Sequence, residues 1–201
     1  MADFFNLSQG VEIDNLDGIH ECYQIDDENI LSNISFENLK CIVTDLCKAL
    51  KAPLFFFIEI PCDEDTEKRL RENDEDLFHK DIYYLDNCTT EVCIAILKRY
   101  GDLLLNDGLV QFGFASHEEE DEIYIQKYKI LSIFSRSISK YEKILMSHNI
   151  INEDKIKTVW DNFSSESSGI LTTIDFNGET IFDIVENLKD VGLYFSHRVE
   201  D

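Results

Sequence analysis

Apolar residues recur at spacings of three and four in three parts of the chain, which is the pattern of amphipathic helices. The first helix is predicted over residues 36–50, and Ser35 is available as its N-cap. A second begins at the threonines of positions 89–90 and ends at the Asn-Asp-Gly of 106–108. A third is predicted over residues 181–188. Each has one apolar stripe and therefore one face to bury.

The most apolar segment, residues 53–61, reads PLFFFIEIP and carries a proline at each end. A strand that is apolar on both faces is typical of the buried centre of a sheet, and proline ends such a strand. The polar loop 116–121 joins two β-rich segments, which predicts a hairpin. The further strands are predicted at residues 81–85, 109–115, 122–134, 170–176 and 193–199.

Weaker signals indicate shorter elements. Ser139 and Glu142 have the spacing of a capping box, which predicts a helix to about His148. Asn152 and the acids after it predict another helix through residue 160. Residues 62–80 are polar and charged, so they predict a loop or a short surface helix.

Helices and strands alternate along most of the chain, which predicts an α+β (mixed α/β) fold with one mixed, partly antiparallel sheet and helices packed on it. The chain of 201 residues has the length of a single domain, and it contains no repeat and no linker. Residues 1–34 show no sustained apolar period and contain no Lys or Arg. We therefore expect an acidic N-terminal arm over residues 1–34, with one strand at 20–25, and a single α/β domain over 35–201.

The charge of the chain indicates which classes of partner to expect. The chain has 41 Asp and Glu against 18 Lys and Arg, a net charge of -23 and a pI near 4.4. Phosphate backbones and anionic membranes are bound through Lys and Arg, so neither is expected as a partner. The basic, tyrosine-containing stretch 126–157 is the one candidate for nucleic-acid binding, and the net charge opposes it. A cationic protein is the partner that this charge favours.

Six cysteines raise the question of disulfides. The opening MADFFNLSQG has no basic or apolar region of a secretory signal, and the longest apolar run, residues 54–58, is too short to span a bilayer. We therefore expect a cytoplasmic protein whose cysteines are reduced core residues.

Motifs for chemistry are missing from the sequence. It contains no glycine-rich phosphate loop, no G-x-S-x-G elbow and no C-x-x-C pair. His117 begins a sequence like H-E-x-x-H, but Asp121 stands where the second histidine belongs. We therefore expect no catalytic residue, no metal and no cofactor.

Two residues are kept as candidates for a hidden active site. Glu59 alternates with phenylalanines on an apolar strand, and burial there would suit it to acid–base work. Its position just before Pro61 favours an exposed glutamate at the end of the strand instead. His79 lies near Asp81, and only a fold could bring them into an acid–base pair.

The excess of acids is concentrated in patches before residue 123: the arm, residues 63–76 and the unbroken run 118–122. A hairpin loop does not need five adjacent carboxylates, since Gly, Asn or Ser turn more easily. The acids could serve solubility in a generally acidic protein, and the sharper interpretation is that these loops form a surface that meets a basic partner. The candidate partner-binding residues are Asp63, Glu64, Asp65, Glu72, Asp74, Glu75, Asp76, Glu118, Glu119, Glu120, Asp121 and Glu122.

In size, acidity and mixed α/β character the whole chain resembles small bacterial immunity (antitoxin) proteins of polymorphic and contact-dependent toxin systems. The resemblance rests on no motif and gives no residue a role. It implies a non-enzymatic protein that neutralises a cationic, nuclease-type toxin by direct binding. Two alternatives stay open: an enzyme or small-ligand-binding protein with a site assembled from distant residues, and an acidic inhibitor that mimics nucleic acid.

Overall fold

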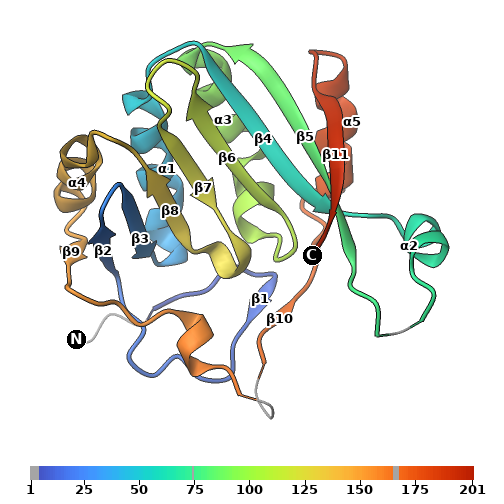
Figure 1. The fold of residues 1–201 in the computed structure, drawn as a ribbon, viewed down its shortest axis with the longest axis horizontal. Helices are drawn as coiled ribbons and strands as arrows, with labels where there is room; N and C mark the ends of the chain where they lie inside the picture. The colour runs from blue at the N-terminus through green and yellow to red at the C-terminus, as the bar shows by residue number, and fades with distance from the viewer. Residues whose placement is uncertain (1–4, 74, 165–167) are drawn as a thin grey trace.

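The computed structural model, which describes residues 5–73, 75–164 and 168–201, is built on a nine-stranded sheet (Figure 1). Its strands are antiparallel except for one parallel pair at the edge, β2 with β9. A separate small sheet joins β1 (Val11–Glu12) to β10 (Ile170–Leu171). In spatial order the strands of the main sheet are β11 (Tyr194–Glu200), β5 (His79–Cys88), β4 (Leu54–Pro61), β6 (Gln111–Ser116), β7 (Glu122–Ile125), β8 (Leu131–Phe134), β3 (Asn29–Asn33), β2 (Cys22–Asp26) and β9 (Ile151–Asn152).

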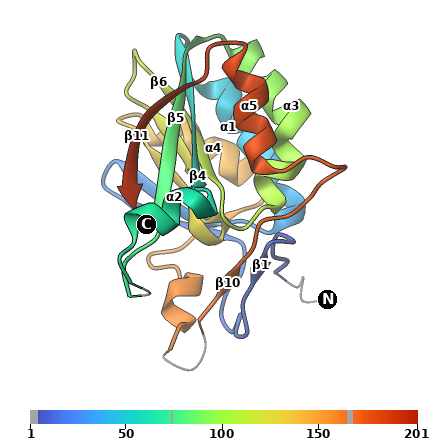
Figure 2. The same cartoon turned by 90° about the vertical axis from the view of Figure 1, so that its right-hand side faces the viewer.

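Helices cover one face of this sheet (Figure 2). They are α1 (Phe36–Ala49), α3 (Thr90–Asn106), α4 (Ile138–Ser147) and α5 (Ile181–Lys189), while the short α2 (Glu64–Leu70) lies beside the lower ends of β4 and β5. Two single-turn helices, η1 (Lys127–Lys129) and η2 (Val159–Asn162), occur in connections. The opposite face of the sheet, which we call the open face, bears no α-helix in the described part of the chain (Figure 1). None of the described helices combines the length and apolar character needed to cross a bilayer.

The predicted fold class, a mixed sheet with helices packed on it, is confirmed. The PLFFFIEIP segment is indeed a central strand, since β4 pairs with both β5 and β6. Its side chains at positions 54, 56 and 58 are fully buried under the helices. The three strongly periodic helices are confirmed as α1, α3 and α5, with Ser35 and Thr89 at the first two N-caps.

The N-terminal segment differs from the loose arm expected over residues 1–34. The predicted strand at 20–25 corresponds to β2, which forms a hairpin with β3, and β3 pairs with β8 inside the main sheet. Tyr23 and Ile30 are fully buried. The apolar period was obscured because each strand has five residues and a tight turn, with Asp27 at φ 55°, joins them. Residues 1–4 lie outside the described residues.

Three other predictions were wrong in detail. The segment 122–134 is two strands, since Tyr128 and Lys129 adopt left-handed backbone angles and turn the chain between them. The α4 helix begins after Ser137, so Ser139 is not its cap. The segment 170–176 is a strand only at its first two residues, Ile170 and Leu171, and Phe176 at its end forms an isolated bridge with Glu179.

The helix expected over residues 152–160 is not formed. Its first-turn backbone is used by β2 instead: the amide of Glu153 donates to the carbonyl of Tyr23 at 2.8 Å, and the amide of Ile156 donates to the side chain of Gln24 at 2.9 Å. Tertiary hydrogen bonds therefore override the capping signal at Asn152.

The side chain of Lys129 is buried inside this fold. The Lys129 amine donates to the carbonyls of Leu104 at 3.1 Å and Val110 at 2.7 Å, at the C-terminal end of α3. Burial lowers the pKa of Lys129 to about 7, although Asp107 nearby favours the charged form. Asp107 is also buried and accepts four hydrogen bonds, two from each of the segments 109–110 and 173–174. This polar pair fixes the start of β6 against α3.

Lys129 makes the stability of the protein depend on pH. Between about pH 7 and pH 10.5 the unfolded chain holds a proton on this amine that the folded chain has released, so stability rises with pH in that window. From pH 7 to pH 9, we expect the unfolding free energy of the wild type to rise by about 2 kcal/mol relative to that of the Lys129→Met variant. Urea unfolding at both pH values measures it. The variant lacks the hydrogen bonds to the two carbonyls at either pH. A free-energy difference between the two proteins that does not change with pH would therefore contradict a lowered pKa of Lys129.

Candidate functional site

The acidic run 118–122 occupies the loop between β6 and β7, where the hairpin was predicted. It is largely neutralised by the protein itself. Glu118 forms an ion pair with Lys51 at 2.5 Å, and Glu120 forms one with Arg136 at 2.6 Å. These carboxylates keep 49% and 60% of their surface exposed, so each pair contributes little to stability.

Asp121 lies on the inside of this loop and is 1% exposed. Its carboxylate accepts hydrogen bonds from Lys140 at 2.8 Å and from the Tyr141 hydroxyl at 2.7 Å, both on α4. Burial would raise the pKa of Asp121, but the bonds from Lys140, Ser135 and Tyr141 outweigh it and hold that pKa below its ordinary value. Lys140 also pairs with Glu119 at 2.8 Å. The structure therefore gives Asp121 the position of a structural anchor between loop and helix.

The second acidic patch surrounds α2. Asp63 caps this helix by accepting from the amide of Thr66 at 2.9 Å, and Asp76 closes the following loop by accepting from the amides of residues 72 and 73. Both bonds lower the pKa of their carboxyl group. Asp74 lies outside the described residues. The remaining members, Glu64, Asp65, Glu72 and Glu75, are exposed.

A cavity of about 980 Å³ lies between α2 and the body of the protein. His79 lines it, and its Nδ1 lies 3.2 Å from the Glu67 carboxylate. Asp81 is not part of that pair, because it accepts two hydrogen bonds from the Arg198 guanidinium. The lining is already satisfied: no buried side-chain nitrogen or oxygen of the described residues lacks a hydrogen-bond partner.

Glu59 corrects a sequence expectation, since it is 9% exposed rather than an exposed strand end. Its carboxylate forms an ion pair with Lys80 at 2.5 Å and accepts from the Tyr124 hydroxyl at 2.8 Å. Strand β4 continues in register to Pro61, which pairs with Lys80, so Glu59 points onto the open face instead of emerging from the sheet.

Glu122 lies on the same face and differs from the rest of its run. Among the residues that the structure describes, none forms an ion pair with its carboxylate or donates a hydrogen bond to it. Burial, followed by the nearby charge of Glu59, raises the pKa of Glu122 above its ordinary value. A half-buried carboxylate without a cation is an unfavourable arrangement that a positive charge would relieve.

Aromatic rings surround the two glutamates on the open face. Phe57 lies 5.3 Å from the ring of Tyr124 and 6.1 Å from that of Tyr84. Phe55 contacts Tyr84 at 5.8 Å and the imidazole of His117 at 4.8 Å, measured between ring centroids. The cluster extends to the edge strand, where Tyr194 is 47% exposed. We call Phe55, Phe57, Tyr84, Tyr124, Tyr194 and His117 the aromatic cluster.

The strand register places Glu122 beside this cluster. Phe134, Glu122, Ala115 and Phe55 form one row across β8, β7, β6 and β4. Residues directly opposite each other in antiparallel strands point to the same face, so only the methyl group of Ala115 stands between Glu122 and the Phe55 ring in this row. A carboxylate next to aromatic faces is the environment that holds a Lys or Arg side chain by charge and cation–π attraction.

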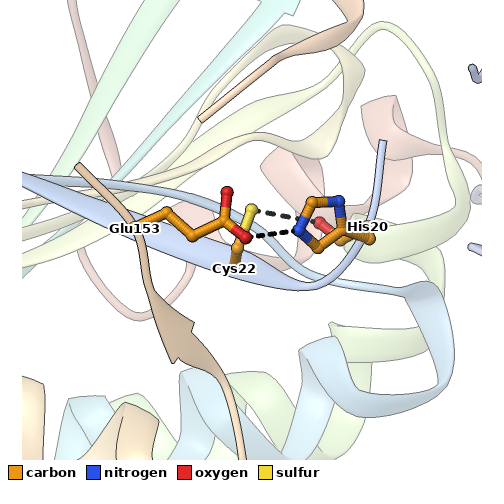
Figure 3. Close-up of side chains that lie close together, drawn as sticks. All are labelled: His20, Cys22 and Glu153. Carbon is orange, nitrogen blue, oxygen red and sulfur yellow. Dashed lines mark hydrogen bonds and ion pairs between the residues drawn. The ribbon is translucent and has the colours of Figure 1, made fainter. Parts of the chain in front are cut away.

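Two further clusters were missed by sequence reasoning. His20, Cys22 and Glu153 bring three potential metal-ligand atoms within 4.8 Å of one another (Figure 3). The hydrogen bond to Glu153 raises the pKa of His20, and burial raises that of the Cys22 thiol to about 11. The H-x-C spacing of the first two could have been noticed, but Glu153 had been assigned to a helix.

On the helical side, the imidazole of His148 lies 3.9 Å from the sulfur of Cys41 and 3.0 Å from the carboxylate of Asp45. The order thiol, imidazole, carboxylate is that of a nucleophilic triad. Cys41 is exposed, however, and its thiol donates to the carbonyl of Asn38 at 2.9 Å. Neither this cluster nor its thiol lines the cavity beside α2.

Comparison with protein-family models finds no match to this chain, and comparisons with curated proteins and with solved structures find no significant match. Functional inference therefore rests on the geometry.

The Glu122 environment has a measurable consequence. Its raised pKa means that the folded chain keeps a proton which the unfolded chain has lost, so this residue lowers stability as pH rises above the ordinary glutamate value. We expect Glu122→Gln to raise the unfolding free energy at pH 7 by up to about 1 kcal/mol, since solvent screens a half-buried group. The gain should shrink toward pH 4. Urea unfolding measures it, with Glu118→Gln as the matched control that gives no gain.

Proposed function

We propose that this chain is a non-enzymatic binding protein of immunity type, which neutralises a cationic, nuclease-type protein toxin in the cytoplasm by direct contact. The observation that carries the proposal is Glu122, a half-buried carboxylate on the open face with no cationic partner among the described residues. The other four acids of its run are already paired or buried. A Lys or Arg side chain of the partner would supply the missing charge.

The aromatic cluster supports a macromolecular partner. Tyrosine and phenylalanine are enriched at protein interfaces, because they bury a large area at a low entropic cost and keep a polar end. Here they lie on a sheet face that no helix covers in the described chain. A cationic side chain entering beside Glu122 would contact both the carboxylate and the neighbouring rings.

The net charge of the chain supports a positively charged partner. A protein of charge -23 attracts a basic surface and speeds its association, and a nuclease must be basic around its nucleic-acid site. The exposed acids at the rim of the open face and around α2 would steer the encounter, while Glu122 would hold the complex. All six cysteines are free and five are buried, which agrees with the reducing compartment proposed here.

The alternative of a small-ligand protein or enzyme is supported less well. It would use the cavity beside α2, where Glu67 already contacts His79 and Cys62 donates its thiol to Asp81. Burial raises the pKa of the Cys62 thiol to about 12, which disfavours the nucleophilic thiolate. His79, Glu67 and Cys62, the groups of this cavity best suited to chemistry, therefore already have partners within the protein.

The proposal is tested by capture followed by measured affinity. The wild-type protein is used as bait in lysate of its source cells at low and at high salt, and a captured basic protein is purified and expressed alone to establish its toxicity. We expect a salt-sensitive complex in which Glu122→Gln weakens binding about 30-fold or more, because the partner's buried cation loses its counter-charge. The charge-matched control Glu186→Gln, at an exposed site on α5 on the helical side of the sheet, should change affinity less than twofold.

Two results would contradict the proposal at different levels. Equal affinity of the Glu122→Gln and Glu186→Gln variants would exclude the open face as the interface. Capture of no basic, toxic protein at low salt would reject the immunity function itself. The whole run is unsuitable as a test, since neutralising the buried Asp121 would also damage the loop.

A further inference from the structure

Three different metal-ligand groups meet where β2 lies beside β9. An imidazole nitrogen of His20, the sulfur of Cys22 and a carboxylate oxygen of Glu153 all lie within 4.8 Å of one another. Figure 3 shows the carboxylate of Glu153 facing both the imidazole ring and the sulfur. His20 and Cys22 come from one segment, and Glu153 comes from a segment that is distant along the chain.

Backbone pairing fixes this meeting point. Cys22 lies opposite Ile151 and Tyr23 lies opposite Asn152 in the parallel β2/β9 pair. The amide of Glu153 then donates to the carbonyl of Tyr23 at 2.8 Å, which carries the chain one residue further along β2. These main-chain bonds fix the backbone of Glu153 beside the first residues of β2, whether or not its carboxylate has a partner.

The histidine is oriented in the way that metal-binding histidines are. Its Nδ1 atom lies 3.2 Å from the carbonyl of Gly18, so an Nδ1–H donor is anchored there and the other nitrogen, Nε2, points toward Glu153 at 2.7 Å. Ligating imidazoles commonly donate their second N–H to a carbonyl, which fixes the tautomer and the ring plane. Gly18 has φ +78°, a backbone angle that suits glycine, and this turn aims its carbonyl at the ring.

Cys22 is also fixed in position by its surroundings. It is 1% exposed, and the Asn33 amide lies 3.9 Å from its sulfur. The sulfur therefore sits at the floor of the group while His20 and Glu153 lie toward solvent, with 53% and 35% of their side chains exposed. An ion could enter from the solvent side and keep one position open to water.

We propose that His20, Cys22 and Glu153 bind one Zn²⁺ ion through Nε2, the thiolate sulfur and a carboxylate oxygen, with water as the fourth ligand. Thiolate, imidazole and carboxylate are the donors that zinc prefers, and three protein ligands with one open position is an established arrangement. At zinc bond lengths the donor atoms of a tetrahedral site are roughly 3.3–3.8 Å apart. Side-chain rotations that move the donor atoms by about 1 Å would therefore bring them to this spacing. Any proton on Nε2 and the thiol proton leave to solvent when the metal bonds form, and no oxidation state changes.

Such an ion would connect the N-terminal hairpin to the segment after α4. The Lys157 side chain lies beside Gly18, but its amine donates to the carbonyl of Asp17 at 2.8 Å and is therefore already engaged. The negative charge of the whole molecule favours any bound cation. The site is independent of the open face, so its test does not depend on the proposed partner.

The test uses the full chain, freed of metal by a chelator and titrated with Zn²⁺ alone in a calorimeter and with Co²⁺ in an absorption spectrometer. We expect one equivalent to bind, with thiolate-to-cobalt charge-transfer absorption, and an increased melting temperature with zinc. His20→Asn should weaken zinc binding by at least about tenfold, since even changes to the residues behind a ligand cost that much. His20 is exposed, so this variant should fold as wild type does.

The second Cys–His neighbourhood provides the matched control. The Cys41 sulfur lies 3.9 Å from Nδ1 of His148, but the nearby carboxylate of Asp45 contacts the other imidazole nitrogen, so a His148→Gln variant should bind zinc as tightly as wild type. Glu153→Gln should weaken binding in the same direction as His20→Asn. Absence of stoichiometric binding to the wild type would overturn the proposal. So would unchanged affinity in His20→Asn, or cobalt spectra without thiolate absorption.

Discussion

The structure depends on one constraint: every apolar helix stripe packs against the same face of the sheet. The helix-facing side chains of β4, β6 and β7 are completely buried there. The other face must therefore protect its own backbone and side chains with what the strands themselves supply. It does so with large rings and a central ion pair between Glu59 and Lys80, whose side chains are 11% and 18% exposed. Polar groups in such surroundings are costly unless they are paired, and this cost separates Glu59 from Glu122.

Local patterns along the chain were enough to predict the elements whose burial is regular. The PLFFFIEIP segment and the stripes of α1, α3 and α5 follow from period and proline placement alone. The burial and pairing of the carboxylates could not be predicted, because their partners come from segments distant in the sequence. Glu59 is buried by Lys80 on the neighbouring strand and Tyr124 two strands away, and Asp121 is held by Tyr141 on α4. These contacts depend on which distant strands and helices lie side by side, and the pattern within one segment does not specify its neighbours.

The same reason explains the errors near the sheet edge. Residues 152–156 carry helix-start chemistry, yet β2 offers a carbonyl and a glutamine side chain to their amides, and those bonds determine the structure. The parallel pairing of β9 with β2 then brings Glu153 to His20 and Cys22. A metal-ligand group assembled in this way has two members close in sequence and a third that only the fold supplies. The H-x-C spacing alone is too common to indicate a site.

Acidity by itself does not identify a binding surface in this protein. A carboxylate retained only for solubility would lie in water, where its charge costs little, and most acids of the patches around α2 and in the run 118–120 have that exposure or an internal counter-ion. Glu122 has neither, because it is half-buried next to Glu59 and has no cation among the described residues. Selection for stability would replace such a residue, since an amide of the same shape avoids the cost. Its presence beside a row of aromatic rings is therefore best explained by a cation that arrives with a partner.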